Sequence, residues 1–251
     1  MNSAELYDPV ANSFTAVVST MSVGRAYATA TLLPGGKVLI AGGLGDTDDL
    51  ASTEIYDPVA KSFSAGPPMN VARDTANALL LPNGKVLVAG GSSLTSAEIY
   101  DPVANSFTSV PAGMTAARFT PVLTLLFNGK VLIAGGSNQT GILNSSDIYN
   151  PVTDSFAAGP SLNTERESAT ATVLPNGKVL IAGGWASFIG VFATTELYDP
   201  VSNSFAPAAS VASMSGPREN ATATLLPNGK VLIAGGDDGS VTHGGSELYT
   251  P

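Results

Sequence analysis

The sequence has no cysteine, one histidine and one tryptophan among its 251 residues. Disulfides, thiolate metal sites and cysteine nucleophiles are therefore excluded, and a single histidine cannot build a multi-histidine metal centre. Charged residues are scarce at 12%, and 20 acidic residues outnumber 11 basic ones, which gives a net charge of −9. Because phosphate binding needs clustered Lys and Arg, we expect no nucleic-acid partner.

Long apolar runs are also missing, since none approaches the roughly 18 residues that a membrane-spanning helix needs. We therefore expect no membrane-embedded segment. The 27 glycines and 17 prolines recur along the whole chain, which argues against long helices. Apolar residues still make up 44% of the chain, so a buried core is possible.

What the sequence does have is an internal repeat. The octapeptide GKVLIAGG, once with valine for isoleucine, occurs five times, and the first glycines of its glycine pairs are spaced by 48, 45, 48 and 52 residues. A second motif follows each pair, of the type TEIYDPVAKSF. One further copy of this second motif opens the chain at Ala4, and the shortened copy SELYTP, from Ser246, closes it.

Each repeat predicts four short strands. An Ala/Thr-rich strand, such as Ala28–Pro34, is followed by a turn, Pro-Asn-Gly-Lys in three of the five repeats, in which Asn-Gly is a strong hairpin signal. The KVLIA strand is almost continuously apolar, as expected for a buried strand. The AEIY-type strand ends at Asp-Pro, since proline cannot donate to a β-ladder, and a last strand surrounds Ser-Phe. Four antiparallel strands repeated about every 50 residues predict an all-β propeller.

The paired glycines, the Glu-x-Tyr-Asp-Pro segment and the aromatic residue after it resemble the kelch motif over essentially the whole chain. This resemblance implies a β-propeller of four-stranded antiparallel blades in one domain, residues 1–251. Five repeats favour five blades, with a last blade closed by an N-terminal strand (velcro closure). The alternative is an excerpt of a six- or seven-bladed propeller. One copy of the third strand is then surplus, so we expect a monomer or a strand-swapped dimer.

The arginines form one candidate site, because all five lie 17 residues before the first glycine of a pair. We expect them at the start of the first strand of each blade, near one mouth of the channel. They could bind an anion or an acidic ligand. Alternatively they pair with the repeat acids, since the guanidinium suits bidentate carboxylate pairing. The arginines are Arg25, Arg73, Arg118, Arg166 and Arg218, and the acids are Glu5, Glu54, Glu98, Asp147, Glu196 and Glu247.

Variable loops form a second candidate. The turns after the first and third strands of each repeat are nearly invariant, whereas the loops at the other end of the blades vary, and binding residues are often carried on such loops. The segment from Trp185 to Phe192 holds the only tryptophan together with Phe188 and Phe192. Exposed aromatic residues often mark partner sites, although the loop could also cover the channel or mediate self-association.

Support for catalysis or a metal is weak. His243 stands alone without a Gly-x-Ser-x-Gly elbow, and the acidic loops at Asp46–Asp49 and Asp237–Asp238 match no recognised calcium motif. Pairs such as Glu167 with Arg166, and Glu219 with Arg218, are the only acid–base candidates. We therefore expect no cofactor and no enzymatic activity.

Three functions follow from these observations. The first is a non-catalytic binding module that presents its variable loops to a protein or a glycan. The second is a recently amplified or engineered repeat array without a ligand, because the repeats are nearly identical. The third is an enzyme at the channel mouth, which the residue inventory disfavours.

Overall fold

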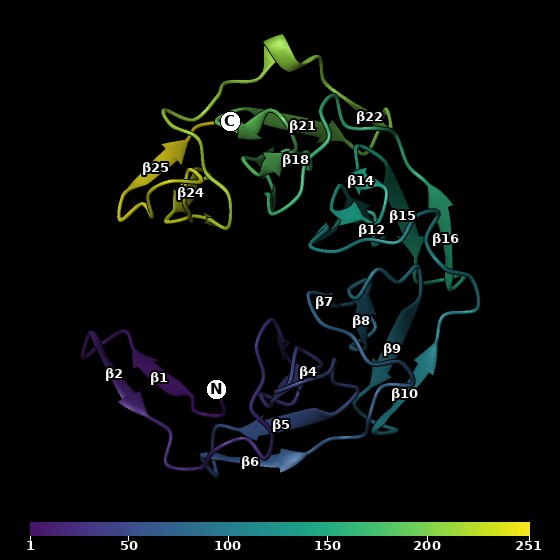
Figure 1. Ribbon diagram of the computed structural model, residues 1–251, viewed down its shortest axis with the longest axis vertical. Helices are drawn as coiled ribbons and strands as arrows, with labels where there is room; N and C mark the ends of the chain where they lie inside the picture. Colours follow the sequence, from purple (N-terminus) through teal and green to yellow (C-terminus); the bar gives the residue numbers. More distant parts are fainter. The chain divides into compact units, whose positions relative to one another are not determined.

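The computed structural model describes residues 1–251, and its strands follow the repeat closely (Figure 1). The chain divides into two compact units, which we describe separately. Unit 1 comprises Met1–Ser92 and Ser96–Val110, and unit 2 comprises Ser93–Thr95 and Pro111–Pro251. The only helix is a three-residue 3-10 turn, η1 (Ala208–Ser210), so no helix is long and apolar enough to cross a membrane.

Unit 1 contains two complete four-stranded blades and a separate N-terminal hairpin. Each blade is an antiparallel meander in chain order, in which the first strand pairs with the second, the second with the third and the third with the fourth. The hairpin pairs β1 (Glu5–Asp8) with β2 (Ser13–Ala16). The blades are β3 (Thr29–Leu32), β4 (Val38–Ala41), β5 (Thr53–Asp57) and β6 (Ser62–Ala65), then β7 (Asn77–Leu80), β8 (Val86–Ala89), β9 (Ala97–Asp101) and β10 (Ser106–Ser109).

Unit 2 contains two more complete blades and a three-stranded last sheet. The first blade is β11 (Val122–Leu125), β12 (Val131–Ala134), β15 (Ser146–Asn150) and β16 (Ser155–Ala158), and the second is β17 (Thr170–Val173), β18 (Val179–Ala182), β21 (Thr195–Asp199) and β22 (Ser204–Phe205). The last sheet is β23 (Thr222–Leu225), β24 (Val231–Ala234) and β25 (Ser246–Tyr249). Two short hairpins are added between second and third strands: β13 (Ser137–Asn138) with β14 (Gly141–Ile142), and β19 (Trp185–Ala186) with β20 (Gly190–Val191).

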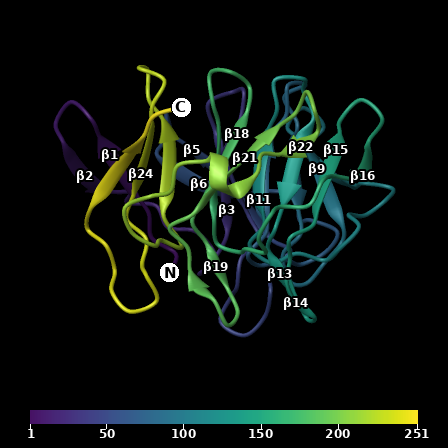
Figure 2. The ribbon, with the colours of Figure 1, turned by 90° about the horizontal axis from the view of Figure 1, so that it is seen from above.

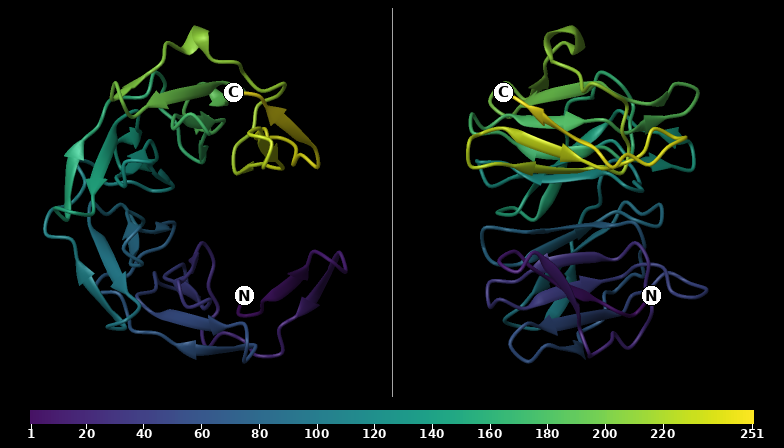
Figure 3. Two further views of the ribbon diagram at one scale, coloured as in Figure 1. Left: turned by 180° about the vertical axis from the view of Figure 1, so that it is seen from behind. Right: turned by 90° about the vertical axis from the view of Figure 1, so that its left-hand side faces the viewer.

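The predicted all-β fold of kelch-type blades is confirmed, and five successive repeats form blade sheets. The expected closure of the last blade is not confirmed. Strand β2 pairs with β1, and β25, drawn in yellow in Figure 3, pairs only with β24. Velcro closure therefore stays a prediction, as does the single domain over residues 1–251.

The core lies between the faces of neighbouring blades within each unit. In unit 1, Leu39 of β4 and Val86 and Val88 of β8 belong to one buried cluster. In unit 2, Leu132 of β12 and Ile181 of β18 do the same. The second strand is buried on both faces in β8, β12 and β18, which explains why it reads as a continuous apolar run.

A glycine pair ends each second strand, and the pair at Gly42 joins its blade to the following blade of unit 1. Both glycines of the pair at Gly42 adopt positive φ, of 66° and 93°. A Cβ on Gly42 would collide with the carbonyl oxygen of Arg73, and the N–H of Gly43 donates to that oxygen at 2.9 Å. Glycine is therefore required both for its conformation and for the close approach of two backbones.

Candidate functional site

The repeat arginines are buried and bound within their own blades through their Nη atoms, whereas the Nε atoms of Arg25, Arg73 and Arg166 have no hydrogen-bond partner. Arg73 is 1% exposed, and its Nη1 donates to the carbonyl oxygens of Gly90 and Ser96 at 2.8 and 3.0 Å. Its Nη2 donates to Ser96 Oγ at 3.2 Å and to Glu98 Oε1 at 3.1 Å. One guanidinium thus closes the loop between β8 and β9 and neutralises the acid on β9.

The same pair recurs in every blade sheet. The five ion pairs have N–O distances of 2.8 to 3.4 Å. Burial lowers the pKa of the Arg73 and Arg166 guanidinium groups, and the partner glutamates oppose this effect. The pairs are Arg25 with Glu54, Arg73 with Glu98, Arg118 with Asp147, Arg166 with Glu196, and Arg218 with Glu247.

The carboxylates also accept backbone hydrogen bonds from the loop that leads into their own blade. The N–H groups of Asn70 and Val71 donate to Glu98 at 2.7 and 3.0 Å, and Asn163 N donates to Glu196 at 2.7 Å. The arginines therefore have a structural role here. With exposures of 0 to 8%, their guanidinium groups are not open to an anionic ligand in solvent, and Glu5 on β1 has no arginine partner.

The tryptophan segment forms the hairpin β19–β20, which is firmly attached to unit 2. Trp185 pairs with Val191, and Ala186 pairs with Gly190. The backbone of Trp185 also exchanges two hydrogen bonds with Glu167, at 2.9 and 3.0 Å. In Figure 2 this hairpin extends from the same end of unit 2 as the hairpin β13–β14.

The aromatic residues of this hairpin divide between an anchor and an exposed tip. Phe192 is 8% exposed, and its ring lies 5.0 Å from the Arg166 guanidinium carbon in a cation–π contact. Phe188, with φ of 65°, and Ile189 are the exposed tip, at 109% and 63%. Trp185 is half-buried between them. The expectation that Phe192 presents itself to a partner is corrected, because the blade already covers its ring.

The corresponding loops of the other repeats have polar tips. Leu44–Asp49 and Asp237–Thr242 each close through isolated bridges, and β13–β14 carries Gln139 and Thr140 at its turn. The loop between β8 and β9 is shorter and contains two serines with positive φ, Ser92 and Ser93. An aromatic tip is therefore a property of the hairpin β19–β20 alone, on a scaffold that the repeats share.

A family model, the kelch motif, matches residues 25–70. This stretch starts at the first arginine and contains β3 to β6, which make one complete blade. The same arginine, glycine pair and acid–Ile/Leu–Tyr strand recur in the other repeats with the same pairing and ion pairs. The chain is a kelch-repeat protein of the β-propeller fold. No curated protein matches its sequence.

The acid–base candidates of this kelch protein are not assembled as the sequence suggested. The guanidinium groups of Arg166 and Arg218 face Glu196 and Glu247 rather than Glu167 and Glu219. His243 Nε2 lies 3.5 Å from Asp238 Oδ2. These positions give no nucleophile held by a base, which is the arrangement that covalent catalysis needs.

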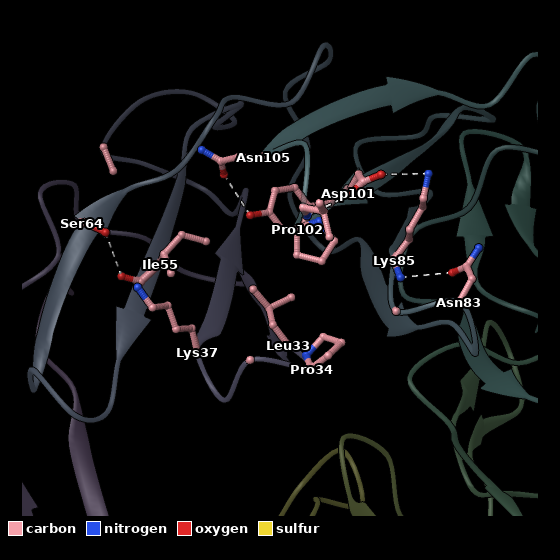
Figure 4. Close-up of a pocket in the computed structure, with 15 residues that line it drawn as sticks. Leu33, Pro34, Lys37, Ile55, Ser64, Asn83, Lys85, Asp101, Pro102 and Asn105 are labelled. Carbon is pink, nitrogen blue, oxygen red and sulfur yellow. Dashed lines mark hydrogen bonds and ion pairs between the residues drawn. The ribbon is translucent and has the colours of Figure 1, made fainter.

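A cavity between the two complete blades of unit 1 was not apparent from the sequence of the kelch repeats (Figure 4). Its volume is about 800 Å³, and Leu33, Ile55 and Pro102 supply apolar walls. Lys85 spans its edge and pairs with Asp101 at 3.0 Å. The equivalent cavity of unit 2 is about 370 Å³ and is lined by Asn128 where unit 1 has Gly35. The replacement of the turn asparagine by glycine is one sequence difference between the two cavities.

Proposed function

We propose that this kelch protein is a non-catalytic binding module whose hairpin β19–β20 docks a protein partner. The observation that carries the proposal is an exposed Phe188–Ile189 tip on a hairpin that is otherwise tied down. Aromatic and aliphatic side chains gain about 1.5 to 3 kcal/mol each when they move from water into a fully packed site. A rigid tip also loses little conformational entropy on binding.

The anchoring contacts support this role. Phe192 packs on Arg166, which is itself held by Glu196, so the hairpin rests on a buried ion pair. The backbone bridge between Trp185 and Glu167 fixes the other strand of the hairpin. The apolar tip is thereby presented to solvent by a hairpin whose base is fixed by backbone hydrogen bonds and by the Phe192–Arg166 contact.

The first test replaces the tip by polar residues. We expect Phe188→Ser with Ile189→Thr to weaken partner binding at least tenfold, since about 1.4 kcal/mol of lost apolar contact corresponds to a factor of ten. The immobilised wild-type and variant proteins are compared for retention of individual cellular proteins, followed by titration of the purified partner. Circular dichroism checks that the variant keeps its fold.

The matched control removes apolar surface elsewhere. Val103→Ser with Val152→Ser changes two side chains that are 96% and 90% exposed in the turns after the third strands. A partner lost by both double variants, or by neither, would contradict a role for the hairpin. If the wild type retained a glycan and the Phe188 variant did not, the ligand of the hairpin would be a sugar and not a protein.

A further inference from the structure

The surroundings of the hairpin β19–β20 carry charge of one sign. Unit 2 contains six Lys and Arg residues and the histidine. Its three arginines are buried in ion pairs. Its three lysines, Lys130, Lys178 and Lys230, lie in the turns that precede the second strands, whereas the hairpins follow those strands. The lysines therefore lie at the opposite end of each sheet, because a strand has its two ends on opposite edges.

Acidic residues gather beside the apolar hairpin instead. Glu167 is bridged to Trp185, and Glu219 exchanges two backbone hydrogen bonds with Asp237, at 2.9 and 3.0 Å. The two segments touch, since Asn220 N donates to Ser168 O at 3.0 Å. The loop Asp237–Thr242 also reaches the hairpin, because a Cβ on Gly239 would lie 3.4 Å from Val191 Cγ2.

These acids are close enough to affect one another. Burial raises the pKa of the Glu219 carboxyl group, and the negative charges of Asp237 and Glu167 raise it further. No ion pair joins Glu167, Glu219 or Asp237 to a basic side chain. His243 is the one titratable base nearby, and it faces Asp238. A cation placed here would relieve repulsion as well as form new contacts.

We propose that the partner of the hairpin β19–β20 is a basic protein segment that combines lysine or arginine with an apolar residue. This inference rests on the proposed function and adds the chemistry of the partner. The apolar residue packs on Phe188 and Ile189, and the basic side chains face Glu167, Glu219 and Asp237. Complementary charge of this kind speeds association and rejects acidic competitors.

The test uses Trp185 as a reporter, since it is the only tryptophan in the chain. The probes are three octapeptides of the pattern Lys-Leu-Lys-Leu-Gly-Lys-Leu-Lys, with all lysines kept, replaced by glutamine, or replaced by glutamate. We expect the lysine peptide to shift the Trp185 emission and to bind at least tenfold more tightly than the glutamine peptide. Its affinity should fall steeply between about 0.05 and about 0.5 M NaCl, as screening increases.

Charge variants locate the effect. Glu219→Gln with Asp237→Asn should weaken the lysine peptide about three- to tenfold, because each exposed charge pair contributes little by itself. The control is Asp8→Asn with Asp154→Asn, which changes the net charge equally, at the end of β1 and in the turn after β15. These replacements suit the fold, since Asn150 and Asn203 occupy the equivalent positions in other repeats and make the same hydrogen bonds. We expect the control to bind within about twofold of the wild type.

Two results would overturn the inference in distinguishable ways. Equal affinity for the lysine and glutamine peptides, lost in Phe188→Ser with Ile189→Thr, would remove the charge preference and leave the proposed function standing. If Phe188→Ser with Ile189→Thr left the affinity for the lysine peptide unchanged, and both charge variants lowered it equally, the peptide would be attracted by net charge alone. That second outcome would contradict the proposed function as well.

Discussion

The hydroxyl group of the third-strand tyrosine has a hydrogen-bond acceptor in some repeats and none in another. In four repeats its hydroxyl donates to an asparagine or aspartate five residues later, as Tyr100 does to Asn105 at 3.0 Å. The acceptor residue adopts positive φ in every case, and asparagine tolerates that conformation better than most residues. In the repeat of β5 and β6 the acceptor is replaced by Lys61, and the buried hydroxyl of Tyr56 has no partner.

We therefore predict that Lys61→Asn stabilises the protein. The new amide oxygen can accept the Tyr56 hydrogen bond, and an unsatisfied buried group costs about 1 to 3 kcal/mol. The expected gain is about 1 kcal/mol in the free energy of unfolding, measured by urea denaturation. The control Tyr56→Phe should remove the gain from Lys61→Asn when the two are combined. An equal gain in both backgrounds would assign the effect to backbone conformation alone.

The strands of the blades were predictable where each repeat carries a clear strand or turn pattern. The Ala/Thr strand, the apolar strand before the glycine pair, and the strand that ends at Asp-Pro all form as expected, because alternation and turn residues agree with burial. The hairpins β13–β14 and β19–β20 were not foreseen as strands, since each contributes only two residues to its ladder. Nor does sequence distinguish exposed Phe188 from buried Phe192, because that difference depends on the packing of Phe192 against Arg166, which precedes β17 of the same blade.

At the scale of an element, we expect the last sheet to be sensitive to acid. Although burial raises the pKa of the Glu247 carboxyl group, hydrogen bonds from Ser215 and Arg218 lower it below its ordinary value. A lowered pKa in the folded state means that Glu247 stabilises the sheet above its unfolded pKa, and this contribution is lost as the pH falls through the folded value. The free edge of β25 leaves the sheet with no fourth strand to compensate.

We thus expect amide hydrogen exchange in β24 and β25 to accelerate as the pH is lowered below about 4.5, after correction for intrinsic rates. The matched variant Glu247→Gln should exchange faster at neutral pH and show a weaker acid response. If the wild type and Glu247→Gln respond identically to acid, another group controls the last sheet.

At the scale of the whole molecule, stability is shared between neighbouring repeats rather than stored in one core. A buried cluster of unit 2 joins Leu132 of one blade to Ile181 of the next, and the N–H groups of Gly136 and Gly184 donate to the arginine carbonyl of the following repeat, at 2.9 and 2.8 Å. In repeat proteins such nearest-neighbour contacts make a local defect spread to adjacent repeats first. The arginines from Arg25 to Arg166 are the places where such a defect would be largest, because each of these four neutralises a buried acid.

Arg118→Leu leaves Asp147 buried without its cation, since both side chains are 0% exposed in the wild type. Breaking a buried pair in this way costs about 3 to 5 kcal/mol. Protection from hydrogen exchange should fall first in β11, β12 and β15, next in β17 and β18, and less in the blades of unit 1. Arg118→Lys, which keeps the charge but loses the fork of donors, should lie between the variant and the wild type.

The matched control is Lys178→Ala, which removes an exposed pair with Asp199 at 3.2 Å and should cost less than about 1 kcal/mol. If Arg118→Leu and Lys178→Ala lowered the free energy of unfolding equally, the buried pairs would have no special structural role. A ligand-binding role for the arginines would then have to be considered again. A loss of protection spread evenly over all blades would instead show that the repeats unfold as one cooperative body, so that nearest-neighbour contacts do not limit how far the defect travels.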